Sequence, residues 1–177
     1  FYYKTFMWPK SFWYKVYEPF IRKAAGFGVA SIKHDKERYE HKYEYCDLLI
    51  TGSGPSGLAS AYAAAKNGAR VILAEDKPRF GGSLLTSEAT IGNQSGKEWA
   101  NSIITELKEM PNVIVKNRAQ VFGYYDHNML VMSERINDHL PKSKKYSPKQ
   151  RLWYIRAKEV VISSGSIERP LVFGNND

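Results

Sequence analysis

One pattern constrains the fold of this chain more than any other, a cluster of glycines between an apolar segment and an alanine-rich one. The cluster reads Gly52-Ser53-Gly54-Pro55-Ser56-Gly57. The apolar segment before it, 47–51, is typical of a buried strand, and the segment 56–67 after it is rich in strong helix formers. A short apolar run at 71–74 completes a strand–helix–strand unit. This order predicts an α/β fold with a parallel sheet.

The glycines meet the separate requirements of a dinucleotide-binding turn. Gly52 permits a tight turn, Gly54 lets the backbone approach a pyrophosphate, and Gly57 lets the helix pack closely on the strands. The helix start offers free N–H groups and a positive dipole to the diphosphate. Glu75 lies 18 residues beyond Gly57, near the ~20 expected for the carboxylate that accepts the ribose hydroxyls. A glycine-rich turn alone is weak evidence and can match by chance, but this context favours NAD or FAD over NADP.

The rest of the chain supplies the further elements of such a fold. Ser95 and Glu98 form a capping box before a helix whose apolar stripe includes Ile103 and Leu107. Further strands are expected at 113–115, 120–125, 129–135, 151–156 and 160–163, the middle three forming an antiparallel meander, with turns at 126–128 and 141–149.

Two short motifs extend the predicted site. Gly81-Gly82 follows the Glu75-Asp76-Lys77 turn, and Ser163-Ser164-Gly165 ends the last predicted strand. In flavoproteins with two dinucleotide-binding domains, a double glycine and an A-T-G-like turn lie at these positions beside the cofactor. We therefore expect residues 46–177 to be the N-terminal, incomplete part of a Rossmann-like FAD/NAD(P)-binding domain with a central parallel sheet and an antiparallel meander.

Residues 1–45 are predicted to form an aromatic-rich arm and a linker. Prolines interrupt the arm, so we expect two short helices, at 11–17 and 19–25, followed by a polar linker at 31–45. The many aromatic side chains cannot all face water, so the arm should pack on the core, on a missing domain or on another subunit. The chain begins without methionine, and we interpret it as a fragment of a longer polypeptide.

Composition argues against several other classes of protein. The single cysteine, Cys46, excludes an internal disulfide framework and a cysteine-based metal cluster in this segment, and it fits a reduced, cytoplasmic setting. No apolar stretch reaches the ~18–20 residues of a membrane span. The net charge of +8 lies in the flanking segments, where a solvated loop or a docking face explains it better than nucleic-acid binding does. The histidines are interpreted as solvated, and we assign no catalytic residue and no metal ligand.

Several segments together resemble the alpha subunits of heterotetrameric sarcosine oxidases, which belong to the flavoproteins with two dinucleotide-binding domains. They are FYYKTFMWP at 1–9, VYEPFIRKAAG at 16–26, GGSLL at 81–85, VFGYYDHN at 121–128, RLW at 151–153 and IERPLVF at 167–173. The resemblance covers essentially the whole chain. The aromatic arm and the FGYYDHN run are its more specific parts, because the glycine motif is generic.

The resemblance implies much that composition does not. Such enzymes demethylate sarcosine oxidatively to glycine, passing the one-carbon unit to tetrahydrofolate and electrons to oxygen. It implies beta, gamma and delta subunits as partners, FAD and FMN elsewhere in the complex, and NAD in the alpha subunit. Carried over residue by residue, the cofactor contacts include the glycine turn, Glu75, Asp76, Lys77, the Gly82-Ser83 pair and Val121. Gly82 is followed by Ser83-Leu84-Leu85 without a cysteine, so dithiol chemistry is excluded here.

Two other functions remain open at this stage. One is the FAD-binding subunit of a related amine or opine dehydrogenase. The other is a non-catalytic domain that holds its dinucleotide permanently and serves as an assembly platform.

Overall fold

A six-stranded sheet organises the larger of the two units into which this chain divides. The computed structural model describes residues 8–26, 28, 30–140 and 147–166. The smaller unit covers Phe1–Lys36 and the larger one Glu37–Asp177. The predictions for the start of the aromatic arm, for most of the 141–149 loop and for the IERPLVF segment lie outside the described residues.

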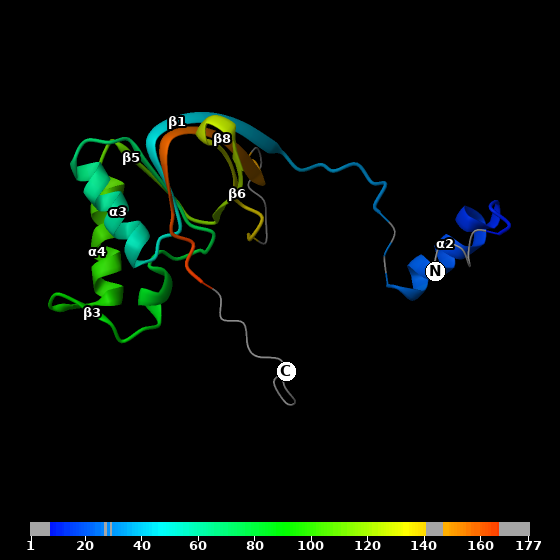
Figure 1. Ribbon diagram of the computed structural model, residues 1–177, viewed down its shortest axis with the longest axis horizontal. Coiled ribbons are helices and arrows are strands. Elements are labelled where there is room, and N and C mark those ends of the chain that lie inside the picture. Colours follow the sequence, from blue (N-terminus) through cyan, green and yellow to red (C-terminus); the bar gives the residue numbers. More distant parts are fainter. Residues whose placement is uncertain (1–7, 27, 29, 141–146, 167–177) are drawn as a thin grey trace. The chain divides into compact units, whose positions relative to one another are not determined.

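The sheet has the order β5-β2-β1-β8-β7-β6 (Figure 1). Its strands are β1 (Tyr39–Thr51), β2 (Val71–Ala74), β5 (Val113–Lys116), β6 (Ala119–Tyr125), β7 (Met129–Arg135) and β8 (Gln150–Ile162). The strands β5, β2, β1 and β8 run parallel, whereas β8, β7 and β6 form an antiparallel meander. This arrangement confirms the predicted α/β class with its central parallel sheet and meander. A small hairpin pairs β3 (Thr90–Ile91) with β4 (Gln94–Ser95).

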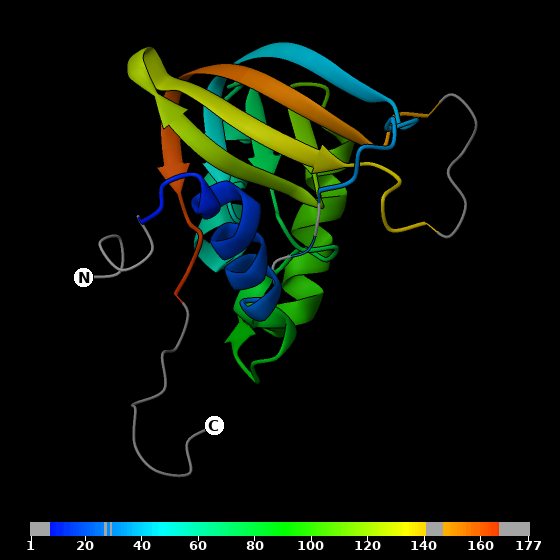
Figure 2. The same cartoon turned by 90° about the vertical axis from the view of Figure 1, so that its right-hand side faces the viewer.

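Two long strands differ from the prediction. β1 begins at Tyr39, so the predicted linker at 31–45 is wrong for its second half, and β8 is one strand where two were predicted. The two strands pair in parallel along their whole length, from Tyr39 beside Gln150 to Thr51 beside Ile162, and curve together (Figure 2). Lys158, inside the continuous β8, forms an ion pair with Asp47 on β1 at 2.8 Å.

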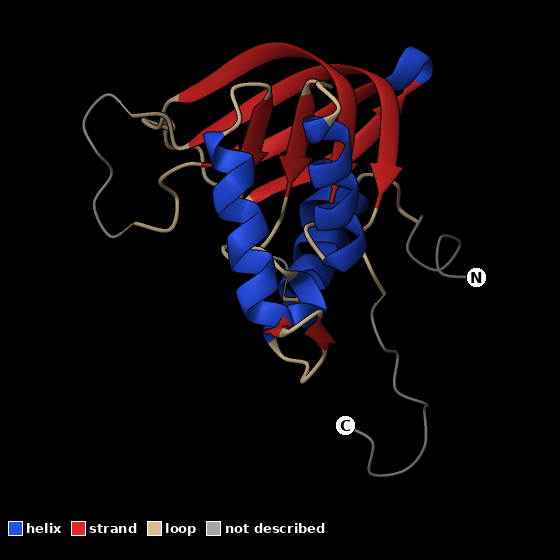
Figure 3. Cartoon of the chain, turned by 90° about the vertical axis from the view of Figure 1, so that its left-hand side faces the viewer, coloured by secondary structure: helices blue, strands red, loops and turns tan. Residues whose placement is uncertain are grey.

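The core has two clusters on opposite faces of the parallel strands. Helices α3 (Pro55–Lys66) and α4 (Gly96–Glu109) lie side by side on one face (Figure 3). The first cluster joins these helices to the sheet and includes Ile50 and Leu73. The second includes the neighbouring residues Leu49 and Ile72 and packs them against meander residues such as Trp153. Successive side chains of the buried parallel strands thus point alternately into the two clusters of the core.

The ends of both helices follow the predicted signals. α3 starts with a proline in its first turn, and Gly68, with φ of +83°, follows its end. Ser95 caps α4 as predicted: its Oγ accepts from the Glu98 N–H at 3.3 Å, and the Glu98 carboxylate accepts from the Ser95 N–H at 3.0 Å. The stripe residues Ile103 and Leu107 are buried. Short 3₁₀ helices lie at η2 (Gly82–Leu85), between β2 and β3, and at η3 (Asp126–Asn128), between β6 and β7.

The smaller unit contains η1 (Trp13–Tyr17), a π-helical turn, and α2 (Glu18–Ala24). Both predicted helical segments are present, but the predicted interruption at Pro19 is absent, because Tyr17 and Glu18 both have helical dihedrals. Pro19 lies in the first turn of α2, which continues directly from η1. Gly26, with φ of +72°, follows the helix end, where a left-handed residue is common.

Candidate functional site

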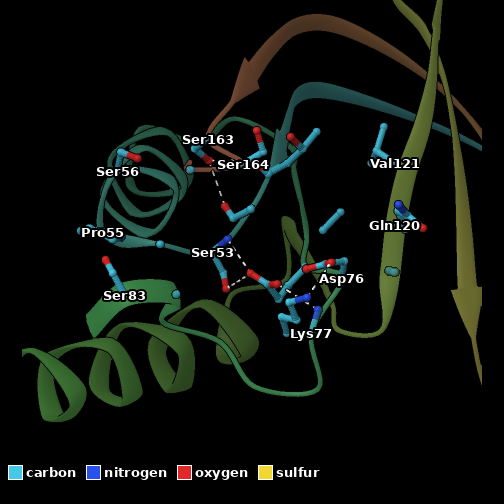
Figure 4. Close-up of a pocket in the computed structure, with 18 of the residues that line it drawn as sticks. Ser53, Pro55, Ser56, Asp76, Lys77, Ser83, Gln120, Val121, Ser163 and Ser164 are labelled. Atoms are coloured by element: carbon cyan, nitrogen blue, oxygen red, sulfur yellow. Dashed lines mark hydrogen bonds and ion pairs between the residues drawn. The ribbon is translucent and has the colours of Figure 1, made fainter. Parts of the chain in front are cut away.

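A pocket of about 580 Å³ opens at the carboxyl ends of three adjacent parallel strands. Its wall includes Thr51 at the end of β1 and Ala74 at the end of β2, and it continues past β8 into the segment 163–166 (Figure 4). The first turn of α3 and the first residues of β6 complete it. The carboxyl edge of a parallel sheet is where open α/β folds bind their ligands.

The structure brings together the predicted site residues, with one exception. Those that line the pocket are Gly52, Ser53, Gly54, Pro55, Ser56, Glu75, Asp76, Lys77, Gly82, Ser83, Val121, Ser164 and Gly165. Gly57 is not among the lining residues and packs behind the turn instead. Their role as cofactor contacts stays a prediction.

Steric contacts explain why the turn needs glycine. A Cβ atom on Gly52 would lie 2.3 Å from the Ser163 carbonyl oxygen, and one on Gly57 would lie 2.0 Å from the Gly52 carbonyl oxygen. The first strand end, the helix start and the end of β8 therefore meet at backbone-to-backbone distance. Gly54 differs, because a Cβ there would meet nothing within 4 Å. The open space beside Gly54 fits the close approach of a ligand to the backbone.

The start of α3 lacks the side-chain cap that α4 has. Its N-cap residue is Gly54, which has no side chain to accept from the first-turn N–H groups. Since the first N–H groups of a helix have no intrahelical acceptor, they are available to an anion. Gly54, Pro55 and Ser56 all line the pocket, so this helix end faces the space where a diphosphate would bind.

Glu75 is a buried carboxylate held by loop donors. Its side chain is only 5% exposed, and its Oε2 accepts from the Ser53 N–H at 2.9 Å and from the Ser53 hydroxyl at 2.5 Å. Its Oε1 accepts from the Lys77 N–H at 2.9 Å. Glu75 is therefore fixed at the pocket wall.

Asp76 is more exposed and adds negative charge beside Glu75. Hydrogen bonding with the Glu75 side chain, and then with the Lys77 ammonium, holds the pKa of Asp76 below its ordinary value. Lys77 lies 3.4 Å from the Asp76 carboxylate. The predicted ribose end of the pocket thus carries two carboxylates and one ammonium, and it disfavours an additional phosphate.

Some lining residues were not predicted as site residues. They are Thr51, Ala74, Ala119, Gln120, Ser163 and Ser166. The Ser163 hydroxyl donates within the turn, lying 2.8 Å from the Thr51 carbonyl oxygen and 3.0 Å from that of Gly52. The S-S-G run was the sequence signal for Ser163, because this serine stands at the end of a predicted strand. Gln120 neighbours the predicted adenine contact Val121 at the start of β6, and both line the pocket.

The titratable lining residues are Glu75, Asp76 and Lys77, which lie together at one end of the pocket. None of the four histidines is among the lining residues. Among the described residues, no group of three or more His, Cys, Asp or Glu side chains could hold a metal ion. In the same part of the chain, no helix is long and apolar enough to cross a membrane. The residues that line the pocket suit the binding of an anionic nucleotide rather than acid–base chemistry by side chains.

Several known proteins are similar to this chain in sequence or in fold. The sequence profile of the family described as FAD dependent oxidoreductase matches residues 47–138. The chain is 48% identical, over its full length, to the sarcosine oxidase subunit alpha of Rhizobium meliloti (strain 1021), and it covers 18% of that protein. It is 37% identical to the corresponding subunit of Corynebacterium sp. (strain U-96), over 86% of this chain and 16% of that one. The chain thus spans less than a fifth of the length of these relatives.

The fold also resembles that of a solved oxidoreductase. The L-proline dehydrogenase of P. horikoshii superposes with a TM-score of 0.58 at 21% sequence identity, covering 84% of this chain and 28% of the other. At this identity the likeness concerns the fold.

Proposed function

Since the chain belongs to the family of FAD-dependent oxidoreductases, we propose that it is the dinucleotide-binding part of a sarcosine oxidase alpha subunit. The complete enzyme would oxidatively demethylate sarcosine to glycine, with tetrahydrofolate accepting the one-carbon unit and oxygen accepting the electrons. Beta, gamma and delta subunits would complete a heterotetramer that carries FAD and FMN at other sites. The 48% identity to such a subunit along the whole chain supports this assignment.

The observation that carries the proposal is the meeting of four separate segments at one pocket. The glycine turn and the S-S-G segment lie more than a hundred residues apart, with the Glu75 turn and the double glycine between them, yet all four contribute lining residues. The turn and the first turn of α3 would hold the diphosphate, and Glu75 with Asp76 would hold the adenosine ribose. The backbone at Val121 would meet the adenine.

We propose NAD as the ligand of this pocket. The carboxylates of Glu75 and Asp76 would accept ribose hydroxyls and repel the 2′-phosphate of NADP. FAD shares the adenosine diphosphate part of the ligand, so the choice of NAD rests on the similarity to alpha subunits. Bound NAD supplies a nicotinamide ring that can accept hydride, while the chain's own residues bind and orient the nucleotide.

We place the enzyme in the cytoplasm. Cys46 is a free, buried thiol, which suits a reducing compartment.

The test uses the native-length protein, co-expressed with its neighbouring subunits and purified as a complex. Acid releases the bound nucleotides, mass spectrometry identifies them, and peroxide formation is measured with sarcosine, with glycine as the control compound that lacks the methyl group. We expect NAD and flavins together, and peroxide with sarcosine only.

The other outcomes identify the alternatives. FAD as the sole nucleotide, with no response to sarcosine, contradicts the proposal and favours an amine or opine dehydrogenase. If the complex still produces peroxide but its bound NAD is never reduced, this domain holds the nucleotide and supports assembly within the same enzyme.

A further inference from the structure

Ser53, the middle residue of the Gly52-Ser53-Gly54 turn, connects three turns of the pocket. It is fully buried, and Figure 4 shows its side chain directed toward the turn that holds Asp76 and Lys77. Its hydroxyl donates to Oε2 of Glu75 and accepts from the Gly81 N–H at 3.2 Å. A hydroxyl has one hydrogen to donate, so the bond to Glu75 uses it. The rotation of this side chain is therefore set by Glu75 on one side and the double-glycine turn on the other.

The glycine pattern does not itself require a hydroxyl at this position. The G-x-G-x-x-G requirements concern the glycines, and the residue between the first two can vary. The Gly81 N–H also donates to the Ser53 carbonyl oxygen at 3.0 Å, so the double-glycine turn keeps a backbone partner without the hydroxyl. The contact that depends on the serine side chain is therefore the one to Glu75.

The effect on Glu75 is to occupy one of its oxygens and orient the other. Oε2 accepts two bonds from Ser53, whereas Oε1 accepts the Lys77 N–H. Each oxygen of a carboxylate can accept about two hydrogen bonds, so Oε1, which accepts one from Lys77, retains capacity for one more donor. Glu75 also lines the pocket, which makes this remaining capacity available to a ligand hydroxyl.

We propose that Ser53 is a positioning residue that holds the Glu75 carboxylate for the hydroxyl groups of the adenosine ribose. The inference rests on the proposed function, because it takes a dinucleotide as the ligand. It extends that function by assigning the recognition of the ribose to a serine–glutamate pair rather than to the carboxylate alone. With alanine at this position, Glu75 would keep its two backbone donors, one on each oxygen, but would lose the hydroxyl that fixes Oε2, so its carboxylate would be held less firmly.

The test measures how strongly the protein distinguishes NAD from its analogue without the 2′-hydroxyl of the adenosine ribose. Affinities for both are measured by titration calorimetry on the nucleotide-free, native-length complex, for the unchanged protein, Ser53→Ala and the control Ser102→Ala. Ser102 is an exposed serine of α4 that does not line the pocket. We expect the unchanged protein and the control to lose at least about tenfold in affinity without the hydroxyl, as for hydrogen bonds to charged groups. In Ser53→Ala the loss should shrink to about threefold or less.

The outcomes separate this inference from the proposed function. If Ser53→Ala binds both nucleotides more weakly by the same factor, the serine supports the turn only and the inference is wrong. If the unchanged protein binds neither nucleotide, the proposed function fails first. Ser53→Cys keeps the shape of the side chain, with a sulfur somewhat larger than the oxygen, and donates only weakly, so an intermediate ratio is expected there. This variant carries the test if Ser53→Ala does not fold.

Discussion

Two glycines three residues apart illustrate how packing, rather than residue type, sets the role of a position. Gly57 lies in the first turn of α3, and a Cβ there would lie 2.0 Å from the Gly52 carbonyl oxygen. Gly54 caps the same helix, and a Cβ there would meet nothing within 4 Å. The first glycine is therefore required by the fold, whereas the second leaves room for a ligand.

This difference predicts opposite phenotypes for the two alanine variants. Gly57→Ala should destabilise the protein by about 1–3 kcal/mol, because the clash is with backbone and cannot be relieved by a side-chain rotation. Gly54→Ala should leave the unfolding free energy nearly unchanged but weaken NAD binding. Urea unfolding and nucleotide titration of both variants check this. Equal losses of stability would show that the open space beside Gly54 is filled in the native protein.

The thiol of Cys46 gives a prediction for the effect of pH on stability. Burial, followed by the nearby Asp47 charge, raises the pKa of Cys46 from 9.0 to about 12. Between these values the unfolded chain releases the proton while the folded protein keeps it, so stability is present below pH 9 and is lost as pH rises toward 12. The slope reaches up to about 1.4 kcal/mol per pH unit.

The Cys46→Ala variant isolates this contribution from lysines and tyrosines that titrate in the same range. The stability advantage of the unchanged protein over the variant should narrow as pH rises above 9, when both are unfolded in urea at several pH values. An advantage that stays constant up to pH 11 would show that the thiol ionises equally in both states.

At the scale of elements, local signals were predictable and long-range pairing was not. The turn at 52–57, the helix that follows it and the capping box of α4 are set by residues within a few positions of one another, and the structure has them where the sequence predicts. The first half of β1 is exposed and rich in charge, although Tyr39, Tyr43 and Tyr45 alternate with charged residues in the two-residue period of a strand. It is a strand because β8 pairs with it, and that partner lies more than a hundred residues away.

The capping box of α4 predicts a local contribution that does not involve the pocket. Ser95→Ala removes the acceptor for the Glu98 N–H and should cost about 1 kcal/mol of unfolding free energy. Ser102→Ala, in the exposed middle of the same helix, should change stability by less than half of that. Thermal unfolding of both variants measures the difference. Equal effects would show that the helix end is held by packing instead of by its cap.

At the scale of the whole molecule, the candidate site exists because three layers end at one edge. The helices pack on one face of the parallel strands and the meander on the other, and the turns that leave these strands surround the pocket. The sequence predicted most of the lining residues because they follow strand ends. It did not predict the bonds between the turns, such as those of Ser53 and Ser163, since these depend on how segments 22 to 112 residues apart come together.

The most direct test of this account is the NAD content of a Glu75→Gln variant of the native-length protein. Glutamine keeps the side-chain size but removes the charge that we assign to ribose recognition, and Glu159→Gln, at an exposed glutamate of β8 outside the pocket, is the matched control. We expect the unchanged protein and the control to purify with about one NAD per chain, and Glu75→Gln to purify largely without it. Full NAD content in a folded Glu75→Gln variant would contradict the assignment of this pocket as the dinucleotide site.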